Sequence, residues 1–182
     1  MPRLFLGIDL PDPIDFDIQL MAGGIPGARW QSAEQLHLTL HFLGDVDGGD
    51  ARRLRAALEQ LEAPRFTMQL RGAGVFPLRG QARTLWVGVT EADPVRLIHD
   101  RSARIIDELG LEREHRKFVP HVTVARLHNP DTRKLGEWVT GHALYASPEF
   151  SVTEVRLYSS VLSHAGAKYR TEAVYPLDEP IE

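Results

Sequence analysis

The tetrapeptide His37-Leu38-Thr39-Leu40 recurs 84 positions later as His121-Val122-Thr123-Val124. Both copies lie in runs of apolar and β-branched residues, which favour β-strands. Because side chains alternate between the faces of a strand, each histidine and its threonine point the same way, about 6.6 Å apart at about 3.3 Å per residue. Two such strands facing one another would bring two imidazoles and two hydroxyls to one pocket.

Two histidines and two threonines in one pocket suit the hydrolysis of a phosphodiester. Attack at phosphorus needs a base for the nucleophile, an acid for the departing alkoxide and donors for the non-bridging oxygens. Imidazole, with an unperturbed pKa of about 6.5, serves as acid or base near neutral pH. Two imidazoles on opposite sides of the phosphorus, one neutral and one protonated, would support in-line displacement. A single His-x-Thr tripeptide is expected by chance and would not indicate an active site, whereas the duplicated motif does.

The composition excludes several other classes of protein. The chain has 182 residues, 43% of them hydrophobic, which suits an ordinary globular protein with a core of its own. It contains no cysteine, so a disulfide scaffold, a thiolate zinc site and a cysteine nucleophile are excluded. The net charge of -4 argues against a basic duplex-binding domain. With no membrane-span or signal-peptide pattern, we expect a cytoplasmic monomer.

The order of elements predicts an α+β fold. Short connections between successive strands favour antiparallel or mixed sheets over a purely parallel one. We expect a single domain, residues 1–182, made of two intertwined lobes that each contribute one His-x-Thr strand to a cleft. The expected strands cover about 4–8, 28–31, 36–43, 66–70, 84–89, 150–157 and 169–175, and the expected helices about 12–21, 50–61, 93–109 and 130–139. The segments 72–83 and 162–168 are expected to be loops.

The residues around both motifs carry a family resemblance that runs nearly end to end. The chain resembles the two-histidine phosphoesterases, in particular the RNA 2',3'-cyclic phosphodiesterase branch once named 2'-5' RNA ligase. The matching stretches are Arg3-Leu4-Phe5-Leu6-Gly7-Ile8-Asp9, Leu36-His37-Leu38-Thr39-Leu40-His41-Phe42-Leu43-Gly44, Val75-Phe76-Pro77, Leu85-Trp86-Val87-Gly88-Val89, Phe118-Val119-Pro120-His121-Val122-Thr123-Val124-Ala125-Arg126 and Leu157-Tyr158-Ser159-Ser160.

The resemblance implies a bilobal fold with a pseudo-twofold cleft and the hydrolysis of an RNA 2',3'-cyclic phosphate to a 2'-phosphate. In that scheme His121 is the general base on water and His37 the general acid to the leaving ribose 3'-oxygen. Thr39 and Thr123 grip the phosphate, and Arg126 matches a family position that helps them. Reversal with a 5'-hydroxyl nucleophile would join RNA ends by a 2'-5' bond. No nucleotide cofactor such as ATP and no metal is expected.

Four further residues near the motifs leave alternatives open. By strict alternation Arg126 falls on the opposite face from His121, so it needs a twist, a bulge or a strand end to reach the cleft. Phe42 and Phe118 could stack a base or pack in the core. His41, expected on the same face as His37, could contact RNA, have no function, or join His37 and His121 as a zinc-like metal site.

Other functions remain as alternatives at this stage. A metallohydrolase would use the three histidines, whereas a non-catalytic RNA-end binder would keep the pocket without turnover. Within the same class the substrate could be a smaller cyclic phosphate or a 2'-5' linked oligonucleotide. The five remaining histidines are expected at the surface; they are His99, His115, His128, His142 and His164.

Overall fold

The computed structural model describes residues 1–90 and 92–179, and its strands pair antiparallel throughout the two sheets. The predicted α+β class is therefore confirmed. The strands are β1 (Arg3–Asp9), β2 (Ala28–Trp30), β3 (His37–Asp45), β4 (Phe66–Met68), β5 (Leu70–Phe76), β6 (Thr84–Val89), β7 (His121–Leu127), β8 (Phe150–Val152), β9 (Glu154–Ser163) and β10 (Gly166–Pro176). The α-helices are α1 (Asp12–Leu20), α2 (Gly48–Ala57), α3 (Asp93–Glu108) and α4 (Thr132–Gly141), with short 3-10 turns at Ala33–Gln35 and Leu58–Gln60.

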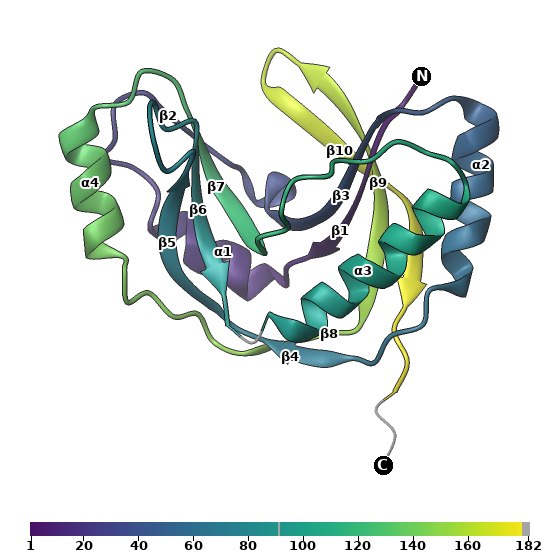
Figure 1. Ribbon diagram of the computed structural model, residues 1–182. Coiled ribbons are helices and arrows are strands. Elements are labelled where there is room, and N and C mark those ends of the chain that lie inside the picture. The colour runs from purple at the N-terminus through teal and green to yellow at the C-terminus, as the bar shows by residue number, and fades with distance from the viewer. Residues whose placement is uncertain (91, 180–182) are drawn as a thin grey trace.

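The main sheet consists of two halves that meet at the motif strands. Its order is β10-β9-β1-β3-β7-β6-β5, with β2 also paired to β7, while β4 and β8 form a separate small sheet. The ladder between β3 and β7 consists of the single pair Leu38–Val122. Figure 1 shows the result as two groups of strands that diverge from this joint, with α4 beyond one group and α2 beyond the other. Both His-x-Thr motifs therefore lie where the halves join.

Each half of the sheet is completed by a segment from the other half of the chain. Helix α1 and β2 follow β1 in sequence, yet β2 pairs with β7. The indole N–H of Trp138 in α4 donates to the carbonyl of Met21, which ties the end of α1 to α4. In the other direction α3 follows β6 but packs beside β3 (Figure 1), where His41 is bonded to the carbonyl of His99. The halves are thus interlocked by two exchanged segments.

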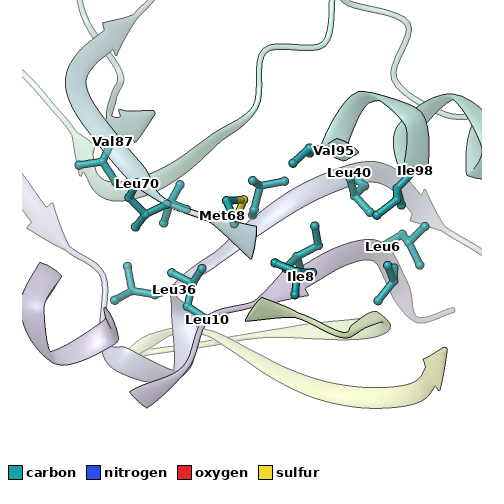
Figure 2. Close-up of a cluster of buried hydrophobic side chains, with 14 of the residues drawn as sticks. Leu6, Ile8, Leu10, Leu36, Leu40, Met68, Leu70, Val87, Val95 and Ile98 are labelled. Carbon is teal, nitrogen blue, oxygen red and sulfur yellow. The ribbon is translucent and has the colours of Figure 1, made fainter. Parts of the chain in front are cut away.

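The core lies under the joint and draws on both halves. Figure 2 shows apolar side chains from β1, β3, β5, β6 and α3 in one cluster. Leu6, Leu38 and Val87 are completely buried, and so is Ile98 on the apolar side of α3. Burial of such side chains contributes about 1.5–3 kcal/mol each. The same packing that stabilises the fold therefore fixes the two motif strands against one another.

The segment 70–76 differs from the expectation. Its glycines suggested a loop, but it forms β5, paired with β6 from Leu70 to Phe76 with an irregularity at Gly72. Gly74 is required there by packing, because a Cβ atom at this position would overlap the indole of Trp86 on the neighbouring strand. Glycine here makes room for an aromatic neighbour instead of breaking the strand. The region expected as a loop is shortened to the turn between β5 and β6.

Candidate active site

His37 and His121 line the same cavity, which has a volume of about 1320 Å³. The residues that follow them, Leu38 and Val122, form the pair that joins the two halves of the sheet. The threonines of both motifs, Thr39 and Thr123, line the cavity as well. Both His-Thr pairs therefore face one pocket, as the alternation of side chains along the two strands predicts.

The two imidazoles are held in the same way. The Nδ1–H of His37 donates to the carbonyl oxygen of Gln35 at 2.7 Å, and the Nδ1–H of His121 donates to that of Val119 at 2.6 Å. Because a carbonyl oxygen can only accept, Nδ1 carries the proton in each ring and Nε2 presents a lone pair. The hydroxyl of Thr39 donates to Nε2 of His37 at 2.8 Å. Both rings are thus oriented for proton transfer at Nε2.

Aromatic residues of the neighbouring strands support the two histidines. Phe5 in β1 pairs with Phe42, whereas Trp86 in β6 pairs with Thr123, so the two aromatic residues occupy different registers relative to the motifs. The ring of Phe5 lies 4.7 Å from that of His37, and the indole of Trp86 lies 6.2 Å from that of His121. No pattern within the two motifs indicates these aromatic neighbours, because they come from other strands. Each histidine is thus supported by an aromatic ring from the strand beside it.

Burial lowers the pKa of both histidines. For His37 burial is the main cause, the positive charges of Arg126 and His121 add to it, and the pKa falls to about 4. For His121 burial again dominates, opposed by its bond to the carbonyl of Val119, and the pKa also lies below its usual value. Both rings are therefore neutral near pH 7 before any anion binds.

A β-bulge brings Arg126 into the cavity. The ladder between β6 and β7 shifts its register between Leu85 and Trp86, which leaves Val124 outside the pairing. Past this extra residue the alternation is reversed, so Arg126 faces the same cavity as His121. Strict alternation places Arg126 on the face opposite His121. The bulge at Val124 is the irregularity that Arg126 needs in order to reach the cavity.

The first motif strand contains the same irregularity. The ladder between β1 and β3 shifts between Leu6 and Gly7 and leaves Leu40 without a partner. After it, His41 turns into the core and Phe42 turns to the cavity, where its side chain is 46% exposed. The expectation that His41 shares a face with His37 is therefore wrong, because the bulge interrupts the alternation on which it rested.

Comparison with known proteins identifies the family. The chain matches the family described as LigT like Phosphoesterase twice, over residues 8–86 and 87–169. The chain belongs to this family. It is 33% identical over 147 residues to the RNA 2',3'-cyclic phosphodiesterase of Aeropyrum pernix, covering 76% of this chain and 80% of the relative. It is 32% identical to that of Methanothermobacter thermautotrophicus, covering 96% and 98%. The crystal structure of LigT from E. coli complexed with phosphate superposes with a TM-score of 0.69 at 26% identity, covering 97% and 98%.

In this LigT-like phosphoesterase His41 is a buried structural residue. Only 3% of it is exposed, and its Nε2 lies 2.9 Å from the carbonyl of His99 and 3.0 Å from the hydroxyl of Ser102, both on α3. Its ring stacks on that of His99 at 4.3 Å. Since His41 faces away from His37 and His121, the three cannot share a metal ion, and the three-histidine metallohydrolase is contradicted. Within residues 1–90 and 92–179, no group of three or more His, Cys, Asp or Glu could hold a metal ion.

The remaining histidines follow the surface expectation only in part. His115, His128 and His164 are exposed. His99 is wrongly expected there, because its ring is packed between His41 and Phe118, whose ring stacks on it at 4.0 Å. His142 is also partly buried, with its ring against Trp138. The periodicity of α3 marks its core side but does not show that a neighbouring loop covers His99.

The wall of the cavity is basic, although the chain as a whole is acidic. Arg83, Arg116, Lys117 and Arg126 line it, together with the single carboxylate of Glu114. Phe42 and Phe118 lie in the same wall and offer aromatic surface. This LigT-like phosphoesterase therefore combines positive charge with aromatic rings around its two histidines, a combination suited to a short piece of single-stranded nucleic acid. No helix in the described part of the chain has the length and apolar character to cross a membrane.

Proposed function

We propose that this protein hydrolyses 2',3'-cyclic phosphate ends of RNA to 2'-phosphomonoesters. The observation that carries the proposal is the convergence of His37 and His121, from two paired motif strands, on one basic cavity. Relatives that share about a third of the sequence bear the name RNA 2',3'-cyclic phosphodiesterase. The cavity volume of about 1320 Å³ leaves room for nucleotides around a phosphate.

In the proposed reaction the two histidines act on opposite sides of the phosphorus. Nε2 of His121 takes a proton from water while the water oxygen attacks phosphorus. The bond from phosphorus to the ribose 3'-oxygen breaks, and His37 gives that oxygen its proton from Nε2. The Nδ1 bonds of both rings to backbone carbonyls keep Nε2 directed at the reacting groups.

The protonation states needed for this reaction are produced by substrate binding. His121 is neutral in the free protein, as a base must be, because its pKa is lowered. His37 has a pKa of about 4, so it is mostly neutral at pH 7 and must gain a proton to act as an acid. An anionic phosphodiester beside it favours the charged imidazolium and raises that pKa. The substrate thereby helps to prepare its own general acid.

Thr39, Thr123 and Arg126 stabilise the phosphoryl group. Once His37 is protonated, its Nε2 no longer accepts from Thr39, so both threonine hydroxyls supply neutral donors to the phosphate. The guanidinium supplies the positive charge that offsets the charge on the non-bridging oxygens. Phe42 and Phe118 offer faces for a nucleobase. All proton transfers and all anion contacts come from side chains of the chain itself, so the proposed reaction uses neither a metal ion nor ATP. A 5'-hydroxyl in place of water would give a 2'-5' RNA linkage, and the monomer contains all parts of the site.

Product analysis tests this function directly. A short RNA with a 2',3'-cyclic phosphate end is incubated with the protein, with and without a chelator, and the products are separated by chromatography. We expect a 2'-phosphate at the same rate in both samples. A 3'-phosphate product, or loss of activity with chelator and its return on adding zinc or manganese, would refute the proposed reaction. Parallel samples with a cyclic mononucleotide and with a 2'-5' linked oligonucleotide identify the preferred substrate.

A further inference from the structure

Each catalytic histidine meets one aromatic ring edge to face, and the two rings differ by a hydroxyl group. The ring of Phe76 in β5 meets that of His121 edge to face, at 5.0 Å and 78°. On the other side, the ring of Tyr169 in β10 meets that of His37 at 5.2 Å and 90°. Both aromatic residues line the cavity. At this pair of positions, the side of His37 has a hydroxyl group that the side of His121 lacks.

Tyr169 is held firmly in place. Its ring also packs edge-on against Phe5 at 5.0 Å. Two residues earlier on β10, the carbonyl of Ala167 accepts a 2.9 Å bond from the side-chain amide of Gln35. The backbone carbonyl of Gln35 is the group that orients His37. Gly166 lies so close to this region that a Cβ atom there would come within 2.6 Å of the guanidinium of Arg29. The strand that carries Tyr169 is thus fixed to the same short segment that positions His37.

The hydroxyl of Tyr169 is free to meet a ligand. Within residues 1–90 and 92–179 it forms no hydrogen bond, whereas the hydroxyl of Tyr145 donates to Asp17 and that of Tyr175 donates to the carbonyl of Arg55. The hydroxyl of Tyr158 also has no partner, but it is completely buried and Tyr158 does not line the cavity. Partly buried tyrosine hydroxyls usually have a partner. Burial raises the pKa of Tyr169, with a smaller opposing effect from the charge of Arg126, so the phenol remains a neutral donor at pH 7. Tyr169 thus lines the same cavity as His37 and Arg126, and its hydroxyl experiences the positive charge of Arg126.

We propose that the Tyr169 hydroxyl donates a hydrogen bond to the phosphoryl group of the substrate on the side of His37. This inference deepens the proposed function and rests on it for the identity of the substrate. The bond is present in the bound substrate and in the bound phosphate product. It therefore contributes to binding throughout the reaction and adds to the differences between the two sides of the site. A phosphate that turned its leaving oxygen toward His121 would lose this donor.

The test removes the hydroxyl and keeps the ring. In Tyr169→Phe the edge-on contacts with His37 and Phe5 remain, and the side of His37 comes to resemble that of His121. The matched control is Tyr158→Phe, because Tyr158 stacks on the same Phe5 ring at 4.8 Å but does not line the cavity. The probe is inorganic phosphate, with its Kd measured by titration calorimetry. We expect the Kd to rise about tenfold in Tyr169→Phe and to stay unchanged in Tyr158→Phe.

Kinetics on RNA with a cyclic phosphate end give a second measurement. Because the bond is present before and during the reaction, KM rises about tenfold in Tyr169→Phe while kcat changes by less than about threefold. We expect nuclear magnetic resonance of the His37 ring to give the same pKa in the variant as in the wild type, because the packing around His37 is unchanged. Thermal unfolding followed by circular dichroism confirms that both variants are folded.

The outcomes separate this inference from the proposed function. Unchanged phosphate binding in Tyr169→Phe, or an equal loss in Tyr158→Phe, overturns the role of the hydroxyl even when RNA is hydrolysed. No phosphate binding by the wild-type protein overturns it too. Conversely, weaker phosphate binding in Tyr169→Phe alone supports the role of the hydroxyl even if the wild type leaves the cyclic RNA end intact, a result that would refute only the proposed substrate.

Discussion

Phe42 and Arg126 occupy equivalent positions in the two motif strands. Each stands three residues after its motif threonine, and each follows a bulge that turns it into the cavity. One position presents an aromatic ring and the other a guanidinium. The approximate symmetry of the backbone therefore supports an asymmetric site, in which one side favours a base and the other an anion.

This asymmetry predicts that two substitutions affect different parts of substrate binding. Arg126→Ala should weaken the binding of inorganic phosphate by about ten- to a hundredfold, because a charge-assisted contact to the anion is lost. Phe42→Ala should leave phosphate binding unchanged and raise KM for an RNA end, because it removes only a stacking surface. Calorimetry with phosphate and kinetics with RNA measure the two effects. Equal loss of phosphate binding in both variants would contradict the division.

Removing either histidine should nearly abolish turnover. His37→Ala and His121→Ala each lose a positioned acid or base, which corresponds to a decrease in kcat of about 10²–10⁴. Initial rates on RNA with a cyclic phosphate end measure the effect, and circular dichroism checks the fold. His115→Ala, which changes an exposed histidine outside the cavity, is the control and should retain full activity. Full activity of His121→Ala would refute its assignment as the base.

The pH dependence of kcat should differ from that of kcat/KM. The reaction needs protonated His37 and neutral His121, and the pKa of His37 in the free protein is about 4. In the free protein the competent form is thus most abundant at mildly acidic pH. Bound anionic substrate raises the pKa of His37, so kcat remains high to a more alkaline pH than kcat/KM. Profiles at saturating and limiting substrate measure the two optima, and coincident profiles would argue against substrate-assisted protonation.

Buried His41 should make the protein sensitive to acid. Its pKa is lowered to about 4, mainly by burial, whereas the unfolded chain binds this proton near pH 6.5. The stability that it contributes is therefore complete above pH 6.5 and is lost as the pH falls through 4, by about 3 kcal/mol in all. His41→Leu should reduce the fall in Tm between pH 7 and pH 4 and leave activity within a few fold. An unchanged fall in Tm would count against this cause of acid sensitivity.

Asp15 should have the opposite effect on stability. It is buried in α1, with 7% of it exposed, and burial together with the charges of Asp9 and Asp12 raises its pKa to about 7. A raised carboxyl pKa means that stability is complete below about pH 4 and declines as the pH rises through 7. Asp15→Asn should therefore raise Tm at pH 8 but have little effect at pH 5. A uniform shift at both pH values would point to packing instead of charge.

The sequence predicted the parts of the site that follow from local regularity. Alternation along a strand is enough to place each motif threonine on the side of its histidine, and duplication indicates that the pairs meet. Alternation fails at Leu40 and Val124, where each strand gains one unpaired residue. A bulge depends on how the neighbouring strand pairs, so no pattern within the motif shows that His41 turns into the core and Arg126 into the cavity.

Packing between distant segments accounts for the other differences. From the sequence alone, Gly74 is expected in a turn. It lies in a strand because the indole of Trp86 packs where a side chain at this position would be. From the sequence alone, His99 is expected at the surface of an amphipathic helix. Its ring is instead covered by the stacked ring of Phe118. The role suggested here for Tyr169 depends on a strand that joins the site from the far end of the chain. Such contacts become visible only when the tertiary arrangement is known.

The exchanged segments make the two halves mutually dependent for folding. β2 is encoded beside β1 but completes the edge of β7, and α3 is encoded beside β6 but covers β3. A polypeptide cut between β6 and α3 would leave each fragment lacking an edge strand or a covering helix that only its counterpart provides. Neither fragment would then be a free-standing unit, whereas the pair, mixed in solution, would rebuild the catalytic cleft by complementation.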